Sequence, residues 1–105
     1  MDLITPVELK ARLDSNDELV ILDVREDWEC LICTIKGSIN ISMSNINIML
    51  EQLSKEQETV VVCHHGMRSS QVGFYLEQNG FTKIINLEGG IDAWAKTVDS
   101  EMEQY

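Results

Sequence analysis

Residues 59–69 read TVVVCHHGMRS, and this stretch decides the fold that the chain is expected to adopt. Its three consecutive valines are typical of a short strand that is buried on both faces of a parallel sheet. Cys63 ends the apolar run, and residues 63–68 are expected to form an irregular loop in which Gly66 permits a tight turn. Residues 69–79 then favour a helix. The stretch therefore predicts a buried strand, a loop and a helix in direct succession.

Elements of the same two kinds are expected on both sides of this stretch. They are, in chain order, a helix capped by Thr5 and ending near Asp14, a strand at 19–24, an extended segment at 37–41, a helix begun by Ser44 and reaching Leu53, a strand at 83–86, and a short helix that carries Ile91 and Trp94. Strands that alternate with helices predict an α/β fold, with a parallel β-sheet flanked by helices on both faces. Ligands of such sheets bind beyond the carboxyl ends of the strands, which selects residues 23–25 and 63–68.

Length and composition indicate a single domain that spans residues 1–105. The chain has 44% hydrophobic and 25% charged residues, the average for a globular domain. Its 18 acidic and 8 basic residues give a formal net charge of −10. Nucleic acids and anionic membranes bind to basic surfaces, so neither is expected as a partner. An acidic tail is expected from about residue 99, with Asp99 to Glu103 in solvent.

No segment predicts a membrane span or a secretory signal. The apolar runs are shorter than the ~18 residues of a spanning helix, and no basic segment precedes an apolar one at the start of the chain. Cys30, Cys33 and Cys63 are an odd number of cysteines, which argues against a disulfide framework. We therefore expect reduced thiols and a cytoplasmic location.

The position of Cys63 suggests a reactive thiol. Backbone N–H groups of a loop between a strand and a helix can converge on an anion, and the helix N-terminus adds partial positive charge. Both effects stabilise a thiolate, and Arg68 adds a permanent cation that suits oxyanions. Residues 59–76 contain no Asp or Glu, although the chain is acidic. The alternative is that Cys63 is a buried core residue in a segment that merely lacks charge.

Four motifs in order resemble rhodanese-like domains. They are LDVREDWE at 22–29, GSINI at 37–41, VVCHHGMRS at 61–69 and NLEGGIDAW at 86–94. The resemblance covers the chain from Thr5 to about Asp99. Thr34 and Lys36 depart from the His and Pro that the family usually has before Gly37, so the local geometry there is open.

The resemblance implies a twisted parallel sheet and sulfurtransferase chemistry. Cys63 would be the catalytic nucleophile, and His64, His65, Gly66, Met67 and Arg68 would form the active-site loop. The thiolate would take the outer sulfur of an anionic donor such as thiosulfate and become a persulfide. Cyanide or a thiol, which could belong to a protein, would remove that sulfur. The loop amides would hold the persulfide and Arg68 would attract the donor, with no metal or other cofactor.

Two alternatives remain open within this fold. One is a persulfide carrier or protein-interaction module with little turnover, which would dock a basic partner on the acidic surface. The other is a phosphatase or arsenate reductase. The resemblance implies Cys-x4-Arg loops for sulfur transfer and Cys-x5-Arg loops for those two activities. Arg68 follows Cys63 after four intervening residues, and Ser69 cannot replace the arginine that clamps phosphate, so sulfur transfer is favoured.

Several other side chains have a structural and a functional interpretation. At most one of His64 and His65 is expected to face the site, because adjacent loop residues point in different directions. Asp23 and Arg25 are expected to support the loop through hydrogen bonds or an ion pair. Among the remaining candidates the structural interpretation is favoured for Glu29, as a support, and for Trp28 and Trp94, as packing residues.

Cys30 and Cys33 could be small partly buried residues, a metal half-site or a redox partner for Cys63. A metal site is disfavoured, because the succession Cys63-His64-His65 lacks the spacing of metal ligands. A resolving disulfide requires a proximity that the sequence does not show.

Overall fold

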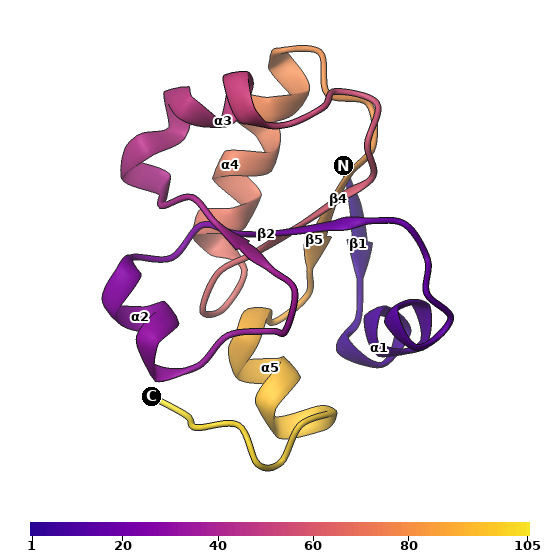
Figure 1. Ribbon diagram of the computed structural model, residues 1–105, viewed down its shortest axis with the longest axis vertical. Coiled ribbons are helices and arrows are strands. Elements are labelled where there is room, and N and C mark those ends of the chain that lie inside the picture. The colour runs from indigo at the N-terminus through magenta and orange to yellow at the C-terminus, as the bar shows by residue number, and fades with distance from the viewer.

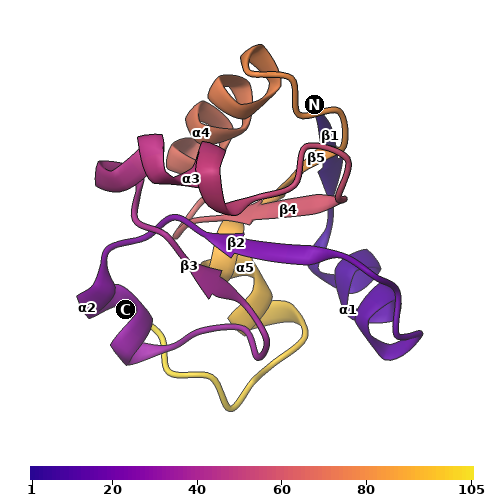
Figure 2. The same cartoon turned by 45° about the horizontal axis from the view of Figure 1, so that its top comes forward.

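Five parallel strands form one sheet in the computed structural model of the chain, which describes all residues from 1 to 105 (Figures 1 and 2). The strands are β1 (Asp2–Ile4), β2 (Val20–Asp23), β3 (Ile39–Asn40), β4 (Thr59–Val62) and β5 (Ile84–Leu87). Their order across the sheet is β1-β5-β4-β2-β3, and every neighbouring pair is parallel. Strand β4 is therefore the central strand, which agrees with its uninterrupted valines.

Helices cover both faces of this sheet. The five α-helices are α1 (Pro6–Asp14), α2 (Asp27–Ile32), α3 (Ile46–Gln52), α4 (Met67–Gln78) and α5 (Gly90–Thr97), and a 3-10 turn, η1 (Met43–Asn45), precedes α3. Figure 2 shows α3 and α4 on one side of the strands and α1 and α5 on the other. Helix α2 follows β2 beyond its carboxyl end. The expected α/β class, with a parallel sheet between helices, is confirmed.

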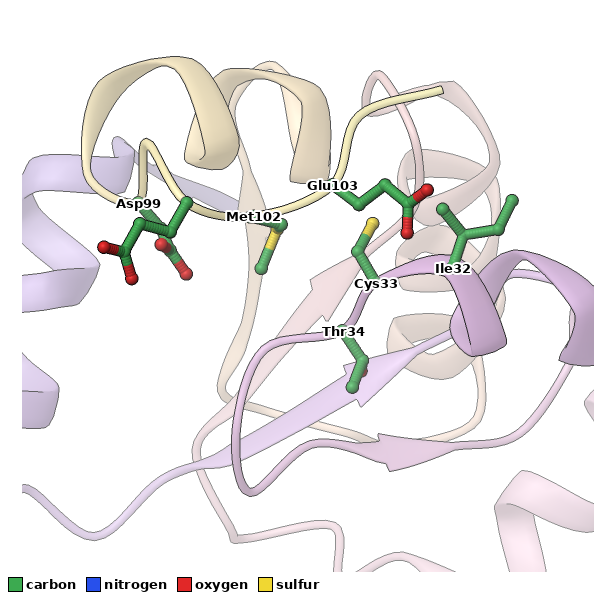
Figure 3. A pocket seen from close by; sticks show the side chains of 7 residues that line it. Ile32, Cys33, Thr34, Asp99, Met102 and Glu103 are labelled. Carbon is green, nitrogen blue, oxygen red and sulfur yellow. The ribbon is translucent and has the colours of Figure 1, made fainter.

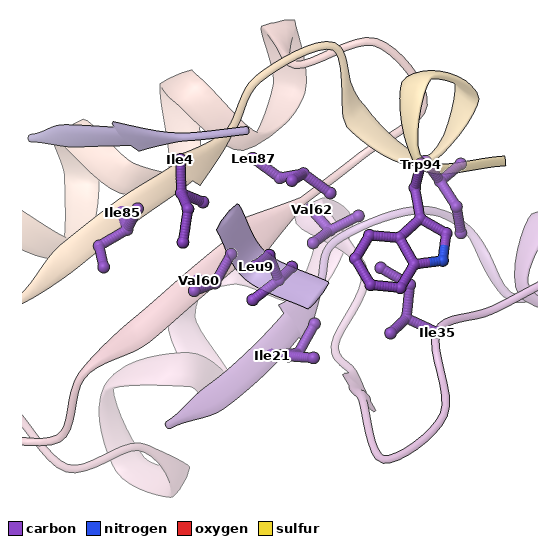
Figure 4. Packing of buried hydrophobic residues seen from close by; sticks show 10 residues of the cluster. Ile4, Leu9, Ile21, Ile35, Val60, Val62, Ile85, Leu87 and Trp94 are labelled. Carbon is purple, nitrogen blue, oxygen red and sulfur yellow. The ribbon is translucent and has the colours of Figure 1, made fainter. Parts of the chain in front are cut away.

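Strand β4 sends alternate side chains into two separate cores. Val60 and Val62 point into the cluster beneath α1 and α5, together with Leu9 and Trp94 (Figure 4). Val61 points into the cluster beneath α3 and α4, and Cys63 extends the same alternation past the end of the strand. The alternation thus decides that Cys63 lies on the α4 side, at the carboxyl edge of the central strand.

The first helix forms as its sequence predicts. Thr5 accepts the N–H of Glu8, and the Glu8 carboxylate accepts the N–H of Thr5, so the capping box is complete. Pro6 occupies the first helical position. The end of α4 also agrees with the sequence prediction, because Gly80 has a φ of +94° just after this helix.

Two elements were not predicted from the sequence, and the starts of two helices differ from the prediction. Strand β1 and helix α2 are short, with 3 and 6 residues, and neither shows an apolar period that could be recognised. Helix α4 begins at Met67 rather than Ser69, because Gly66 adopts a φ of +110° and already serves as its cap. Ser42, not Ser44, is the serine whose side chain caps the turn η1 before α3.

The segment after α5 is less solvated than its acidity predicts. Ser100, Glu101 and Glu103 are exposed, but Met102 and Tyr105 pack against the core cluster of α1 and α5. The segment is thus held against the domain by these two side chains, although acidic residues surround them. In Figure 1 it runs from the end of α5 toward α2. Separately, none of the helices has the length and apolar character required to cross a bilayer.

Candidate active site

The sulfur of Cys63 is buried between the loop and the start of α4. The residue is 1% exposed. The N–H of Gly66 points at Sγ over 3.0 Å, and the hydroxyl of Ser69 lies 3.3 Å from it. By helix geometry the N–H groups of the first turn of α4 have no carbonyl partner within the helix. The sulfur therefore lies beside one backbone donor, the N–H of Gly66, and near the positive end of a helix dipole.

Asn86 of β5 supports this loop from below. Its Nδ2 donates to the carbonyl of Gly66 over 3.1 Å, and its Oδ1 accepts the hydroxyl hydrogen of Ser69 over 2.5 Å. Both Ser69 and Asn86 are buried. Ser69 was expected as a supporting residue, whereas Asn86 was not singled out, since an asparagine in a predicted strand carries no signal of a role in a loop 20 residues away.

The N-terminus of α5 holds the loop from the other side. The N–H of Ile91 donates to the carbonyl of Cys63 over 2.9 Å, and the N–H of Asp92 donates to that of His64 over 3.1 Å. The approach is so close that a Cβ on Gly90 would lie 2.4 Å from the carbonyl oxygen of His64. Glycine at this position is therefore a steric requirement of the loop.

Arg68 is engaged by a carboxylate of the protein. Its guanidinium forms two parallel hydrogen bonds to Glu29 of α2, at 2.7 and 2.8 Å. Arg68 is 35% exposed, while Glu29 is buried. The bonds from Arg68 hold the pKa of Glu29 at about 2, despite the opposing effect of burial. The expectation that Arg68 attracts the donor thus meets a guanidinium that is already paired, and Glu29 is the structural residue that the sequence favoured.

A second ion pair lies fully buried at the end of β2. Arg25 binds Asp23 through Nη2 at 2.7 Å and Nε at 2.9 Å, which is the expected pair. Arg25 also donates to the carbonyl oxygens of Glu29 and Cys33. These bonds fasten the middle and the C-terminal end of α2 to the end of β2, and so they fix the helix that carries the partner of Arg68.

Tyr105 joins the two ion pairs, a role that could not be predicted from the sequence. Its hydroxyl accepts from Arg25 and donates to Glu29, each over 2.9 Å. Burial raises its pKa to about 12. Its ring stacks on His64 at a centroid distance of 4.0 Å and meets Trp28 edge-on at 6.1 Å. An aromatic residue in an acidic tail is the signal that could have suggested burial.

The two histidines lie on the outer side of the loop. His64 is half-buried between Tyr105 and His65, and burial lowers its pKa, whereas His65 is exposed. Ligand atoms of His64, His65 and Asp92 lie within 4.8 Å of one another. However, the two rings are stacked at 19°, so their in-plane lone pairs run side by side rather than toward one ion, and Asp92 is bound to Lys96. We assign no metal site to them.

The other two cysteines are also free thiols. Cys30 is half-buried, and burial raises its pKa to about 11. Cys33 borders an open groove of about 320 Å³ with Met102 and Glu103 (Figure 3). Cys63 lines none of the hollows on the surface. In the loop itself, Met67 is 77% exposed.

This geometry defines a class of protein: a parallel α/β domain with one buried cysteine in a loop at the carboxyl edge of its central strand. The family model of the Rhodanese-like domain matches residues 5–97. The chain belongs to that family.

Relatives and solved structures agree with this assignment. The Bacillus subtilis (strain 168) protein named "Putative sulfurtransferase YtwF" is 41% identical over 91 residues, which are 87% of each chain. The "Thiosulfate sulfurtransferase GlpE" of Pseudoalteromonas translucida (strain TAC 125) is 32% identical over 92 residues, 88% of this chain and 87% of that one. A crystal structure of a rhodanese-like domain protein from Staphylococcus aureus has a TM-score of 0.86 at 36% identity and covers 100% of this chain and 99% of its own. The relatives' names support sulfurtransferase chemistry in general.

Proposed function

We propose that the protein is a sulfurtransferase that moves a sulfane sulfur from thiosulfate, or a similar anionic donor, to cyanide or a thiol through a persulfide on Cys63. The observation that carries the proposal is the sulfur of Cys63 beside the Gly66 N–H at the start of α4. Such donors stabilise negative charge on sulfur, which both the attacking thiolate and the persulfide need. The names of the relatives support the reaction class.

The reaction needs two displacements at sulfur. The Cys63 thiolate attacks the outer sulfur of thiosulfate, an S–S bond forms, and the bond to the sulfonyl sulfur breaks with its electron pair leaving as sulfite. Cyanide carbon then attacks the outer sulfur of the persulfide, a C–S bond forms, and the S–S bond breaks to return its pair to Cys63. Thiocyanate is the product. Sulfur, charge and electrons balance without an external oxidant or reductant.

Backbone groups rather than Arg68 are assigned the anion in this proposal. The guanidinium of Arg68 already donates two hydrogen bonds to Glu29 and so positions α2 against α4. The N–H groups at the start of α4 have no such commitment within the helix. Three free thiols fit the reducing cytoplasm that we propose as the compartment.

Intact-protein mass spectrometry tests the proposal. The reduced protein is incubated with thiosulfate, desalted and weighed, and cyanide is then added. We expect a gain of one sulfur atom, its loss on addition of cyanide, and thiocyanate in the supernatant. The Cys63→Ser variant should gain nothing, while Cys33→Ser should gain one sulfur like the wild type. Sulfur on the Cys63→Ser variant, or none on the wild type, would contradict the proposal.

A persulfide carrier is the second candidate, and one observation favours it. Cys63 is almost completely buried and the nearby Arg68 is paired, so little positive charge is available to draw a small anion from solution. A carrier would receive and deliver its sulfur in contact with a protein, and the net charge of −10 suits a basic partner. Slow loading from thiosulfate with fast loading from a protein persulfide would distinguish the carrier from the enzyme.

A further inference from the structure

The sulfur of Cys63 belongs to a closed ring of hydrogen-bonding contacts that joins four residues. Gly66 donates its N–H to Sγ, Sγ contacts the hydroxyl of Ser69, Ser69 donates to Asn86, and Asn86 donates to the carbonyl of Gly66. The contact between Sγ and Ser69, at 3.3 Å, is the one in which either atom could carry the hydrogen. The other three contacts determine which of these two atoms can donate the hydrogen.

The direction of these three bonds follows from which groups can donate. The carbonyl of Gly66 only accepts, so the amide nitrogen of Asn86 must face it and the amide oxygen must face Ser69. That oxygen also only accepts, so Ser69 must donate its single hydroxyl hydrogen to Asn86. Ser69 then has only lone pairs left for the sulfur. The Cys63 thiol can therefore donate to Ser69, but a thiolate there would face a lone pair.

We propose that Ser69 and Asn86 are positioning residues that hold an acceptor, not a donor, against the sulfur of Cys63 and so favour its thiol over its thiolate. Ser69 could serve a thiolate only by turning its hydrogen away from Asn86. The oxygen of Asn86 is buried and would then lack a donor. The pair thus opposes the Gly66 N–H and the helix terminus, which favour the thiolate.

The inference deepens the proposed function, on which its consequence for sulfur transfer rests. In a persulfide the negative charge lies on the outer sulfur, and Sγ is bonded to two atoms without a proton. A lone pair from Ser69 then opposes little charge, whereas it opposes the thiolate that leaves when an acceptor takes the outer sulfur. Because a poorer leaving thiolate departs more slowly, the pair prolongs the life of the loaded state.

Several other titratable or charged groups lie in or around the loop. They are His64 and His65 within the loop, Arg68 on α4, Glu29 on α2, Asp23 and Arg25 at the end of β2, Asp92 on α5, and Tyr105 in the segment after α5. All of them are unchanged in the variants below. Their effects are therefore common to every comparison.

The test is the pH profile of Cys63 alkylation by iodoacetamide, a neutral reagent, read on the Cys63 peptide by mass spectrometry. We expect Ser69→Ala to lower the midpoint pH by about half to one unit, which is a rate gain of about three- to tenfold below both midpoints. Ser70→Ala is the matched control, because Ser70 is the next residue of α4 and its hydroxyl makes no hydrogen bond to the protein; its profile should match wild type. A hydroxyl that donated to the thiolate would instead make Ser69→Ala raise the midpoint, which would overturn the inference.

The variant Asn86→Leu tests whether Asn86 acts on Cys63 through the hydroxyl of Ser69, which we call the relay, or only supports the loop. Leucine has a similar size and frees the hydroxyl of Ser69 to donate to sulfur, so the midpoint should fall. In a Ser69→Ala background the same Asn86→Leu change should have no further effect. Equal shifts in both backgrounds would show that Asn86 acts only on the loop and would refute the relay. If Asn86→Leu does not fold, the direction in which Ser69→Ala shifts the midpoint pH of alkylation still tests the inference.

Alkylation requires no sulfur donor, so this test is independent of the proposed function. A shift in Ser69→Ala without sulfur uptake from thiosulfate would refute the function and keep the inference. Where uptake does occur, we expect the persulfide of Ser69→Ala to be discharged by cyanide faster than that of wild type. Equal discharge rates would contradict the longer life that we attribute to the loaded state.

Discussion

Replacing Gly90 by alanine should disturb the loop of Cys63, although Gly90 lies outside that loop, at the start of α5. Gly90 has a φ of +62°, which costs an alanine about 1 kcal/mol. The added Cβ would also lie 2.4 Å from the carbonyl oxygen of His64 and 2.5 Å from that of Cys63. An ordinary contact starts at 3.4 Å, so the loop and α5 must separate by roughly 1 Å.

This separation breaks the two hydrogen bonds that fasten the loop to α5. They run from the N–H groups of Ile91 and Asp92 to the carbonyls of Cys63 and His64. At about 1 kcal/mol each, and with the backbone cost, the total loss of unfolding free energy is about 3 kcal/mol. The matched control is Gly37→Ala, where φ is +86° and no atom lies within 4 Å of the new Cβ. It should lose only about 1 kcal/mol.

Urea unfolding of both variants, followed by circular dichroism, measures the difference, which should be about 2 kcal/mol. Alkylation of Cys63 in the folded variants then reports whether the loop has moved, and we expect a changed rate for Gly90→Ala alone. If Gly90→Ala loses no more stability than Gly37→Ala, the close packing of α5 on the loop is not what holds the site.

Two further predictions concern the ion pairs beside the loop. Arg68→Ala removes the partner that depresses the pKa of Glu29 to about 2. A carboxyl group whose pKa is depressed in the folded state stabilises the fold above its unfolded pKa of about 4.3, and this effect is lost as the pH falls. The free energy of unfolding of wild type should therefore exceed that of the variant by about 2 kcal/mol at pH 7 and by much less at pH 2. An equal difference at both pH values in urea unfolding would contradict the prediction. Tyr105→Phe deletes the hydroxyl that bridges Arg25 and Glu29 and should lose about 1–2 kcal/mol, whereas Tyr75→Phe, whose hydroxyl makes no hydrogen bond to the protein, should change the free energy of unfolding by less than about 0.5 kcal/mol. Similar losses in the two tyrosine variants would show that the bridge contributes nothing.

The central unit of the fold could be predicted because its signals are local. Three valines, a cysteine and a glycine within eight residues specify a strand, its end and the cap of the next helix. Strand β1 could not be predicted, since three residues are too few to show a period and its pairing with β5 is a contact across the whole chain. Helix α2 is likewise short, and the tertiary bonds from Arg25 and Arg68 hold it in place.

The sequence was sufficient to predict which loop residues lie near Cys63, but not which residues from other segments contact them. Cys63, Gly66 and Ser69 lie on one continuous segment, so their proximity follows from the loop alone. Asn86 and Tyr105 come from segments more than fifteen residues away. Such contacts depend on how the elements pack, and one sequence carries no record of that packing.

The folded site also changes the meaning of the charge pattern. Residues 59–76 contain no acid, which suggested a segment free of negative charge around the thiol. Folding brings Glu29 to Arg68 and Asp92 to within 3.7 Å of His65, both from distant segments. Arg68, the permanent cation of the loop, thus faces a carboxylate of the protein. If the proposed function holds, backbone N–H groups positioned by Gly66 and Gly90 would bind the anionic donor, and the geometry of the loop, rather than its net charge, would select the sulfur compounds that react.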